Sequence, residues 1–234
     1  MSKGVAMISG ASRGIGAAIA ARLVGDGWNV SLGVRGGRMP DFAAQLPPES
    51  VLACAYDAMT GKDEARWLAE TRARFGPVGC IVANAGIMVA KSVIDAEDEE
   101  VAAMMEVNAF APRRLVRAAW EDLRAGGRGR VVIVASLSGK RVKSALSGSY
   151  SMSKFAAVAL AHGIRHAGFD AGIRATAVCP GFVATDMGLS LSGRPAEAMT
   201  SPDDLARVVS MLIDLPNEAS VAEFAVNCQA EEFF

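Results

Sequence analysis

The chain is poor in cysteine and histidine, the residues typical of disulfide-rich and metal-binding proteins, and it lacks the long apolar runs of membrane proteins. It has four cysteines and two histidines in 234 residues. No run of about 18 or more apolar residues occurs, so no segment predicts a membrane-spanning helix. The 24 basic and 25 acidic residues leave a net charge of −1, which provides no field to attract nucleic acid or an anionic lipid surface. We therefore expect a cytoplasmic protein that binds neither nucleic acid nor membranes.

The cysteines and histidines show no spacing typical of a metal site. The cysteines, at positions 54, 80, 179 and 228, include no C-x-x-C pair, and each lies in or beside an apolar run. Reduced thiols buried as small hydrophobic side chains are the favoured interpretation, with a disulfide as the alternative. His162 and His166 stand at helical spacing without the glutamate of an H-E-x-x-H motif. We predict an ordinary helix face there and no metal.

Apolar runs alternate with helical patterns along the whole chain. Hydrophobic residues make up 51% of the sequence and charged residues 21%, enough to bury a full core. The predicted strands are Val5–Ile8, Asn29–Val34, Val51–Tyr56, Val78–Ala83, Arg130–Ala135, Ile173–Cys179 and Ser220–Val226. The predicted helices are Ala17–Val24, Lys62–Phe75, Glu97–Arg124, Ser149–Ala167 and Pro202–Asp214. This alternation predicts one α/β domain over residues 1–234, a doubly wound, Rossmann-type parallel sheet with helices on both faces.

One segment fits neither pattern. Residues 185–201 are rich in Gly, Ser and Met and precede the last predicted helix. We interpret this segment as a lid over the substrate, and a passive surface loop is the alternative.

A glycine-rich turn follows the first predicted strand. The sequence from Ser9 to Gly16, SGASRGIG, lies between that strand and an alanine-rich helical segment. Glycines permit positive φ and close backbone approach, and the start of a helix offers free N–H groups to an anion. Strand, glycine turn and helix in this order favour dinucleotide binding over a plain tight turn.

A tyrosine and a lysine stand one helical turn apart in the sequence YSMSK. Tyr150 and Lys154 would project from the same helix face. A fixed ammonium beside a phenol favours the phenolate, so we expect Lys154 to lower the pKa of Tyr150 and make it a usable acid or base. Taken alone, the pair could equally lie on a solvated helix face.

These motifs together make the chain resemble the classical short-chain dehydrogenase/reductase family, from end to end. The family's spaced glycines appear as Gly10, Gly14 and Gly16, and its Asn-Ala-Gly element as Asn84-Ala85-Gly86. The residues that match its catalytic set are Asn108, Ser136, Tyr150 and Lys154. Its motif beside the nicotinamide is matched by Pro180, Gly181, Val183 and Thr185. A set of independent matches in the right order is far more specific than any single motif.

The resemblance implies a role for each matched residue. Tyr150 would exchange a proton with the substrate oxygen, and Ser136 would hold that oxygen. Lys154 would bind the nicotinamide ribose, and Asn108 would keep a helix open for a proton-relay water. The alternative for Asn108 is a polar side chain that satisfies helical backbone groups. The implied coenzyme-binding residues are Gly10, Ser12, Arg13, Gly14, Ile15, Gly16, Arg35, Asp57, Asn84, Tyr150, Lys154, Pro180, Gly181, Val183 and Thr185.

The end of the second predicted strand bears on the choice of coenzyme. An acidic residue at this point binds the ribose of NAD, whereas arginine accommodates the 2′-phosphate of NADP. The strand ends in Val34-Arg35-Gly36 with no acid, and Arg13 adds a second positive charge. We therefore predict NADP rather than NAD, with two solvated arginines as the alternative. By the resemblance, Asp57 would contact adenine in either case.

The catalytic serine has two candidates. Ser136 lies fourteen positions before Tyr150 and Ser138 lies twelve before it. The family commonly uses the spacing between these two. We choose Ser136 because residues 136–139, SLSG, match the family's S-x-x-G after the fifth predicted strand. The extra residue then lies in the loop 140–148.

The function predicted from these features is an NADP-dependent oxidoreductase that interconverts a carbonyl compound and an alcohol. A nucleotide-responsive regulator on the same fold is the alternative, and a related epimerase or dehydratase is a third class. The family resemblance also implies a homodimer or homotetramer, in which the segment Glu97–Arg124 would pack with the Tyr150 helix across a twofold axis.

Overall fold

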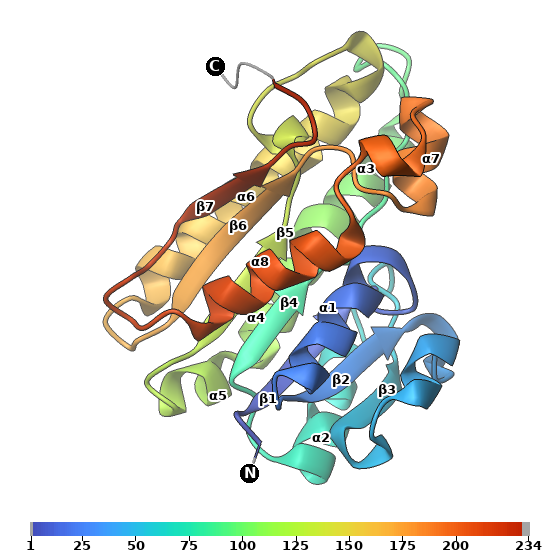
Figure 1. Cartoon of the computed structure of the whole chain (residues 1–234). Helices are drawn as coiled ribbons and strands as arrows, with labels where there is room; N and C mark the ends of the chain where they lie inside the picture. The colour runs from blue at the N-terminus through green and yellow to red at the C-terminus, as the bar shows by residue number, and fades with distance from the viewer. Residues whose placement is uncertain (1, 231–234) are drawn as a thin grey trace.

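Seven of the apolar runs form one sheet in the computed structural model, which describes residues 2–230. The strands are β1 (Val5–Ser9), β2 (Asn29–Val34), β3 (Val51–Ala55), β4 (Cys80–Ala83), β5 (Arg130–Val134), β6 (Arg174–Pro180) and β7 (Glu223–Val226). Their order is β3-β2-β1-β4-β5-β6-β7, and every neighbouring pair is parallel (Figure 1). The predicted doubly wound sheet is confirmed.

The direction of winding reverses between β1 and β4. The chain runs outward from β1 to β3 and then returns to place β4 on the other side of β1, with Ile8 opposite Val82. The loops that leave these two strands therefore diverge at their carboxyl ends. This switch point is where open α/β sheets bind ligands.

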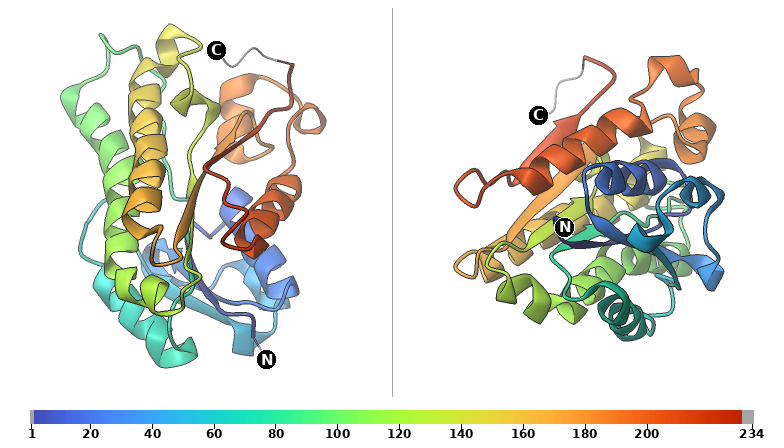
Figure 2. Two further views of the ribbon diagram at one scale, coloured as in Figure 1. Left: turned by 90° about the vertical axis from the view of Figure 1, so that its left-hand side faces the viewer. Right: turned by 60° about the horizontal axis from the view of Figure 1, so that its bottom comes forward.

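Helices cover both faces of the sheet (Figure 2). They are α1 (Gly14–Gly25), α2 (Glu64–Phe75), α3 (Asp98–Met105), α4 (Ala111–Ala118), α5 (Trp120–Ala125), α6 (Gly148–Gly168), α7 (Asp186–Ser192) and α8 (Pro202–Asp214). Core side chains of α1 and α8 share one hydrophobic cluster, and those of α2, α4 and α6 share the other. The sheet separates these two cores.

Each core depends on close packing against the strands. Ile19 and Leu23 of α1 and Leu205 of α8 are completely buried on one face. Burial of each such side chain contributes about 1.5–3 kcal/mol. On the other face, a Cβ atom on Gly33 of β2 would lie 2.5 Å from the ring of Trp67, which is itself fully buried. Glycine at this position makes room for the indole.

The predicted helix Glu97–Arg124 is not continuous. It is divided into α3, a π-helical segment (Glu106–Phe110), α4 and α5. Pro112 has no N–H to donate to the carbonyl four residues earlier, at Asn108, so the regular ladder is interrupted there. Instead, the N–H of Ala111 donates to the carbonyl of Glu106, which widens the turn that holds Asn108.

Other boundaries shift by a few residues, and one helix was not predicted. β7 begins at Glu223 rather than Ser220. Within 185–201, α7 begins after Thr185, whose hydroxyl accepts a hydrogen bond from the N–H of Gly188, and ends at Gly193 with a φ of 63°. The lid remains a prediction.

The expectations from composition can be compared directly with the structure. All four cysteines are free thiols, and Cys54, Cys80 and Cys179 are buried as predicted, whereas Cys228 is only half-buried. No helix within residues 2–230 is long and apolar enough to cross a membrane. Met1 and residues 231–234, which the predicted domain includes, lie outside the described residues.

Candidate functional site

The glycine turn after β1 accepts no side chains at two of its positions. A Cβ on Gly10 would lie 2.8 Å from the Cα of Ala85, and a Cβ on Gly16 would lie 2.4 Å from the carbonyl oxygen of Gly10. Gly10 and Gly14 also have positive φ values of 65° and 57°. The turn is therefore built for close approach of backbone to backbone, and of backbone to a ligand.

The helix that follows begins without a side-chain cap. Arg13 occupies the N-cap position of α1 in an extended conformation, and the first turn contains no acidic residue. The N–H groups at this end remain available to an anion, and the helix dipole favours negative charge there. Ser12 is exposed beside them, and Ile15 packs partly against the core. These features fit a coenzyme pyrophosphate.

Asn84 and Ser9 fasten the turn to the loop after β4. The Asn84 side-chain amide donates to the carbonyls of Ser9 (3.1 Å) and Gly10 (3.0 Å). The hydroxyl of Ser9 accepts from the N–H groups of Asn84 and Ala85, each at 3.1 Å. Asn84, predicted as a coenzyme residue, lies against the glycine turn and braces it. Ser9 was not singled out from the sequence.

Arg35 and Asp57 lie at the carboxyl ends of β2 and β3. Arg35 is exposed and forms no ion pair with another described residue. Asp57 accepts a hydrogen bond from the N–H of Met59 at 3.0 Å. The Arg13 guanidinium instead donates to the carboxylate of Asp186 at 2.6 Å. Positive charge thus lies at this edge of the sheet, but one of the two arginines already has a partner.

The segment after β6 closes over the glycine turn. Pro180 ends β6, and the N–H of Gly181 donates to Val226 at 2.7 Å. Val183 is buried and pairs with Thr200. Thr185 packs against the turn, since its Cγ2 would lie 3.1 Å from a Cβ on Gly14. The residues predicted to flank the nicotinamide therefore adjoin those predicted to bind the phosphates.

Lys154 is buried beside Tyr150 on α6. The lysine Nζ donates to the carbonyl oxygen of Val134 at 2.9 Å and lies 5.7 Å from the centre of the Tyr150 ring. Lys154 is only 4% exposed to solvent. Burial disfavours the ammonium and lowers the pKa of Lys154 to about 8.

The phenol of Tyr150 is raised in pKa, not lowered. Burial disfavours the phenolate and raises the pKa of Tyr150 to about 12, and a hydrogen bond from Ser136 offsets only part of this effect. The expected lowering by Lys154 is therefore wrong for this arrangement. Desolvation is the largest cause of both shifts, and it moves each pKa toward the neutral form of its group.

Of the two candidate serines, Ser136 is the one whose hydroxyl acts on Tyr150, where it favours the phenolate and lowers the pKa of the phenol. The Ser136 hydroxyl also accepts from the N–H of Ser138 at 3.1 Å, which holds its side chain at the start of a short 3-10 turn (Leu137–Gly139). The following loop, 140–147, contains a second such turn before α6 begins. That loop accommodates a sequence separation one residue longer than the common family spacing.

Asn108 links three parts of the site. Its side-chain oxygen accepts from the N–H of Ile87, and its amide donates to Ile87 O and to the hydroxyl of Ser153, all at 2.9 Å. Ser153 in turn donates to the carbonyl of Tyr150 at 2.7 Å. Gly86 lies beside Asn108 and Lys154, and a Cβ at this position would lie 3.2 Å from Asn108 Oδ1 and 3.5 Å from Lys154 Nζ.

Asp186 is another residue that sequence reasoning missed. Its carboxylate joins α7 to the glycine turn, and its partner Arg13 is 173 positions away in the chain. A local signal was present, because Thr185 followed by Asp186 is typical of a helix start. The ring of His162 instead hydrogen-bonds the carboxylate of Glu223 at 2.6 Å. Among the described residues, no group of three or more potential metal ligands is found.

The fold is that of an α/β protein of the Rossmann type. The short chain dehydrogenase family model matches residues 4–194. The chain therefore belongs to the short-chain dehydrogenase family, as the resemblance predicted.

Similar proteins include enzymes of several names. The chain is 35% identical to an agropine synthesis reductase of Rhizobium rhizogenes over 97% of its own length and 53% of the relative, so it spans about half of that protein. It is 26% identical to an acetoacetyl-CoA reductase of Shinella zoogloeoides, over 89% of the chain and 90% of the relative.

Solved structures agree with these relatives. An alcohol dehydrogenase from the archaeon Thermococcus sibiricus, complexed with 5-hydroxy-NADP, superimposes with a TM-score of 0.87 and 31% identity over 98% of both chains. A blue fluorescent protein from a metagenomic library, in complex with NADPH, gives a TM-score of 0.85 and 26% identity over 97% of both chains.

The burial of Lys154 predicts a pH dependence of stability. The pKa is about 8 in the fold against 10.5 for the free side chain, so between these values the unfolded chain holds a proton that the native chain lacks. The free energy of unfolding of the wild type should therefore rise from pH 8 to pH 10, by about 2–3 kcal/mol relative to Lys154→Met. Urea unfolding of both proteins across this range measures the difference, and parallel curves would contradict it.

Proposed function

We propose that this protein is an NADP(H)-dependent oxidoreductase that interconverts a carbonyl compound and an alcohol. The observation that carries the proposal is the cluster of Tyr150, Ser136 and Lys154 at the carboxyl end of the sheet, next to an uncapped helix start. A phenol with a hydroxyl partner is suited to hold a substrate oxygen and exchange a proton with it.

Three observations support NADP(H) as the coenzyme. β2 ends without an acidic residue, and Arg35 at that end has no described ion-pair partner. Arg13, the N-cap residue of α1, adds a second guanidinium that could bind the additional phosphate of NADP(H). Two similar solved structures contain 5-hydroxy-NADP and NADPH. A guanidinium can bind a phosphate by two parallel hydrogen bonds, which a ribose hydroxyl cannot match.

The roles of the chain's own residues follow from their protonation. When bound, the nicotinamide group supplies or accepts a hydride. Tyr150 is protonated at neutral pH, and burial raises its pKa further, so its phenol would donate to a carbonyl oxygen in the direction of reduction. Ser136 would orient that oxygen from its hydrogen bond with Tyr150. Lys154, whose Nζ donates to the carbonyl of Val134, would supply the proton that replaces the one lost by Tyr150. Asn108 would hold the loop after β4 in place by accepting the hydrogen bond from Ile87.

Replacement of Tyr150 by Phe tests catalysis apart from binding. We expect Tyr150→Phe to lower kcat for a reducible carbonyl compound by about 10²- to 10⁴-fold, because the proton donor is removed. NADPH binding, followed by fluorescence, should persist. The assay is NADPH oxidation across a panel of ketones and aldehydes, with NADH as the coenzyme control.

The same experiment tests the alternative that the protein is a nucleotide-responsive regulator, which no observation in the described residues favours. If no member of the panel is reduced by the wild type, or if Tyr150→Phe turns over as fast as the wild type, the proposed oxidoreductase function fails.

Separate alanine variants distinguish the two serines. Ser136→Ala should lower kcat/KM by about 10²- to 10³-fold because the hydroxyl that contacts Tyr150 is lost. Ser138→Ala should retain nearly normal turnover, since only its backbone N–H is used in the turn. Steady-state kinetics of both variants gives the answer, and the reverse ranking would reassign the role to Ser138.

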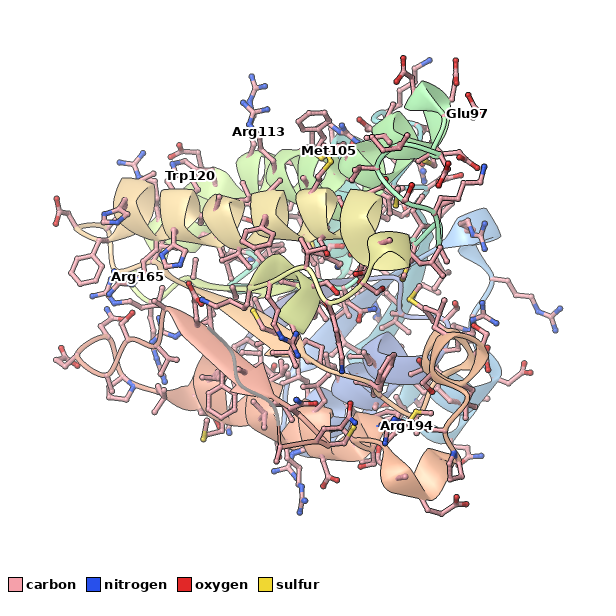
Figure 3. The ribbon with its side chains drawn as sticks, turned by 90° about the horizontal axis from the view of Figure 1, so that it is seen from above. Glu97, Met105, Arg113, Trp120, Arg165 and Arg194 are labelled. Carbon is pink, nitrogen blue, oxygen red and sulfur yellow. The ribbon has the colours of Figure 1, made fainter. Side chains whose placement is uncertain are left out.

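We also propose that two copies of the chain associate through α4 and α6. Phe110, Met152 and Phe155 are large apolar side chains exposed by 50%, 53% and 45% on the neighbouring π-helical segment and α6. Figure 3 shows this segment beside α6, with Arg113 projecting away from the molecule. One face used twice across a twofold axis would bury these side chains in both copies. Cytoplasmic location stays a prediction.

A charge placed in this face should separate the copies. We expect the wild type to be at least dimeric, and Phe155→Glu to shift the mass toward the monomer, because burial of an unpaired carboxylate is costly. Light scattering coupled to gel filtration measures the mass. Met211→Glu, at an equally exposed residue of α8 on the other side of the sheet, is the matched control. A monomeric wild type, or dissociation by the control alone, would refute the interface.

A further inference from the structure

An ion pair connects the glycine turn to α7. The Arg13 NH1 group donates to Asp186 Oδ2 at 2.6 Å, and the two side chains are 75% and 71% exposed. Arg13 is the N-cap residue of α1, and Asp186 is the first residue of α7. The pair therefore lies beside the helix start that is proposed to bind the pyrophosphate, and Arg13 is also one of the two arginines proposed to bind the additional phosphate of NADP(H).

The carboxylate is held in place by its backbone. Thr185, which precedes it, accepts from the N–H of Gly188 at 3.2 Å, and its own N–H donates to Val183 at 2.7 Å. The Thr185 methyl also packs on Gly14. Asp186 thus remains beside the glycine turn wherever the long Arg13 side chain points, and Arg13 is the movable member of the pair.

We propose that Asp186 is a specificity-determining residue, whose carboxylate competes with the additional phosphate of NADP(H) for the Arg13 guanidinium. This inference rests on the proposed NADP(H) function. It states that the carboxylate weakens binding of the phosphorylated coenzyme and so narrows the preference for NADP(H) over NAD(H).

Two effects act in the same direction. Arg13 must leave Asp186, at least in part, before its guanidinium can bind a phosphate as a fork. The carboxylate, which lies 2.6 Å from the Arg13 guanidinium, would also repel the negative charge of a phosphate bound by that guanidinium. The pyrophosphate is common to both coenzymes, so its interaction with Asp186 cancels in the ratio of their affinities. Only the additional phosphate of NADP(H) makes the ratio depend on Asp186.

Arg35 provides an internal comparison. It lies at the same edge of the sheet but forms no ion pair with another described residue, so Asp186 does not compete for it. If the inference is correct, loss of Arg13 costs more NADP(H) affinity when Asp186 is absent than when it is present. Loss of Arg35 costs the same in both backgrounds. A merely structural role of Asp186 at the start of α7 would not produce this difference.

The experiment measures coenzyme binding without substrate. Dissociation constants for NADP+ and NAD+ are determined by titration calorimetry for the wild type and for Asp186→Asn. Because exposed ion pairs are weak, we expect Asp186→Asn to tighten NADP+ binding by about two- to fivefold, with NAD+ binding little changed. The gain should fall as salt rises, since both effects are screened.

Matched variants complete the design. Glu197→Gln removes one negative charge from an exposed position of the same segment, without a described partner for that carboxylate, and should leave both dissociation constants unchanged. Arg13→Gln and Arg35→Gln are each combined with Asp186→Asn to complete two double-mutant cycles. Coupling is expected in the Arg13 cycle and not in the Arg35 cycle.

The outcomes separate this inference from the function on which it rests. A wild type that binds neither NADP+ nor NADPH overturns both. A wild type that binds NADP+ while Asp186→Asn has the same or weaker affinity overturns only the competition. Equal tightening by Glu197→Gln would also overturn it, because a general change of charge would then account for the effect.

Discussion

The close approach of the chain after β1 to the chain after β4 is the constraint on which the site depends. Gly10 lies so near Ala85 that no larger residue fits, and Asn84 and Ser9 bind the two loops together. The same loop continues to Gly86, which leaves room for Asn108 and Lys154. The close contact between these two loops therefore holds the start of α1 near Tyr150 and Lys154 of α6.

Much of this arrangement could be predicted from sequence because its signals are local. Apolar runs, the glycine turn and the spacing of Tyr150 and Lys154 each lie within a few residues, and the sheet follows from their alternation. The interrupted helix and α7 were missed for different reasons. Pro112 marked the interruption, but periodicity alone continues across it. Asp186 acquires its partner only when segments 173 positions apart meet.

The protonation of the site could not be predicted from spacing. Sequence places Lys154 one helical turn from Tyr150, which suggests that charge controls the phenol. Burial depends on what covers both groups, and that covering comes from β5, the turn after it and the loop after β4. In the folded chain, the loss of water outweighs the neighbouring charge, and the pKa of Tyr150 rises while that of Lys154 falls.

The π-helical segment has a mechanical consequence. Asn108 and Phe110 belong to the same wide turn, yet the first is buried in the site and the second is half exposed on the outer surface. A contact made with Phe110 on the outer surface is therefore made with the same turn in which Asn108 hydrogen-bonds Ile87 and Ser153. The wide turn thus connects an exposed aromatic side chain directly to the hydrogen bonds that hold Asn108 and Ser153 beside Tyr150.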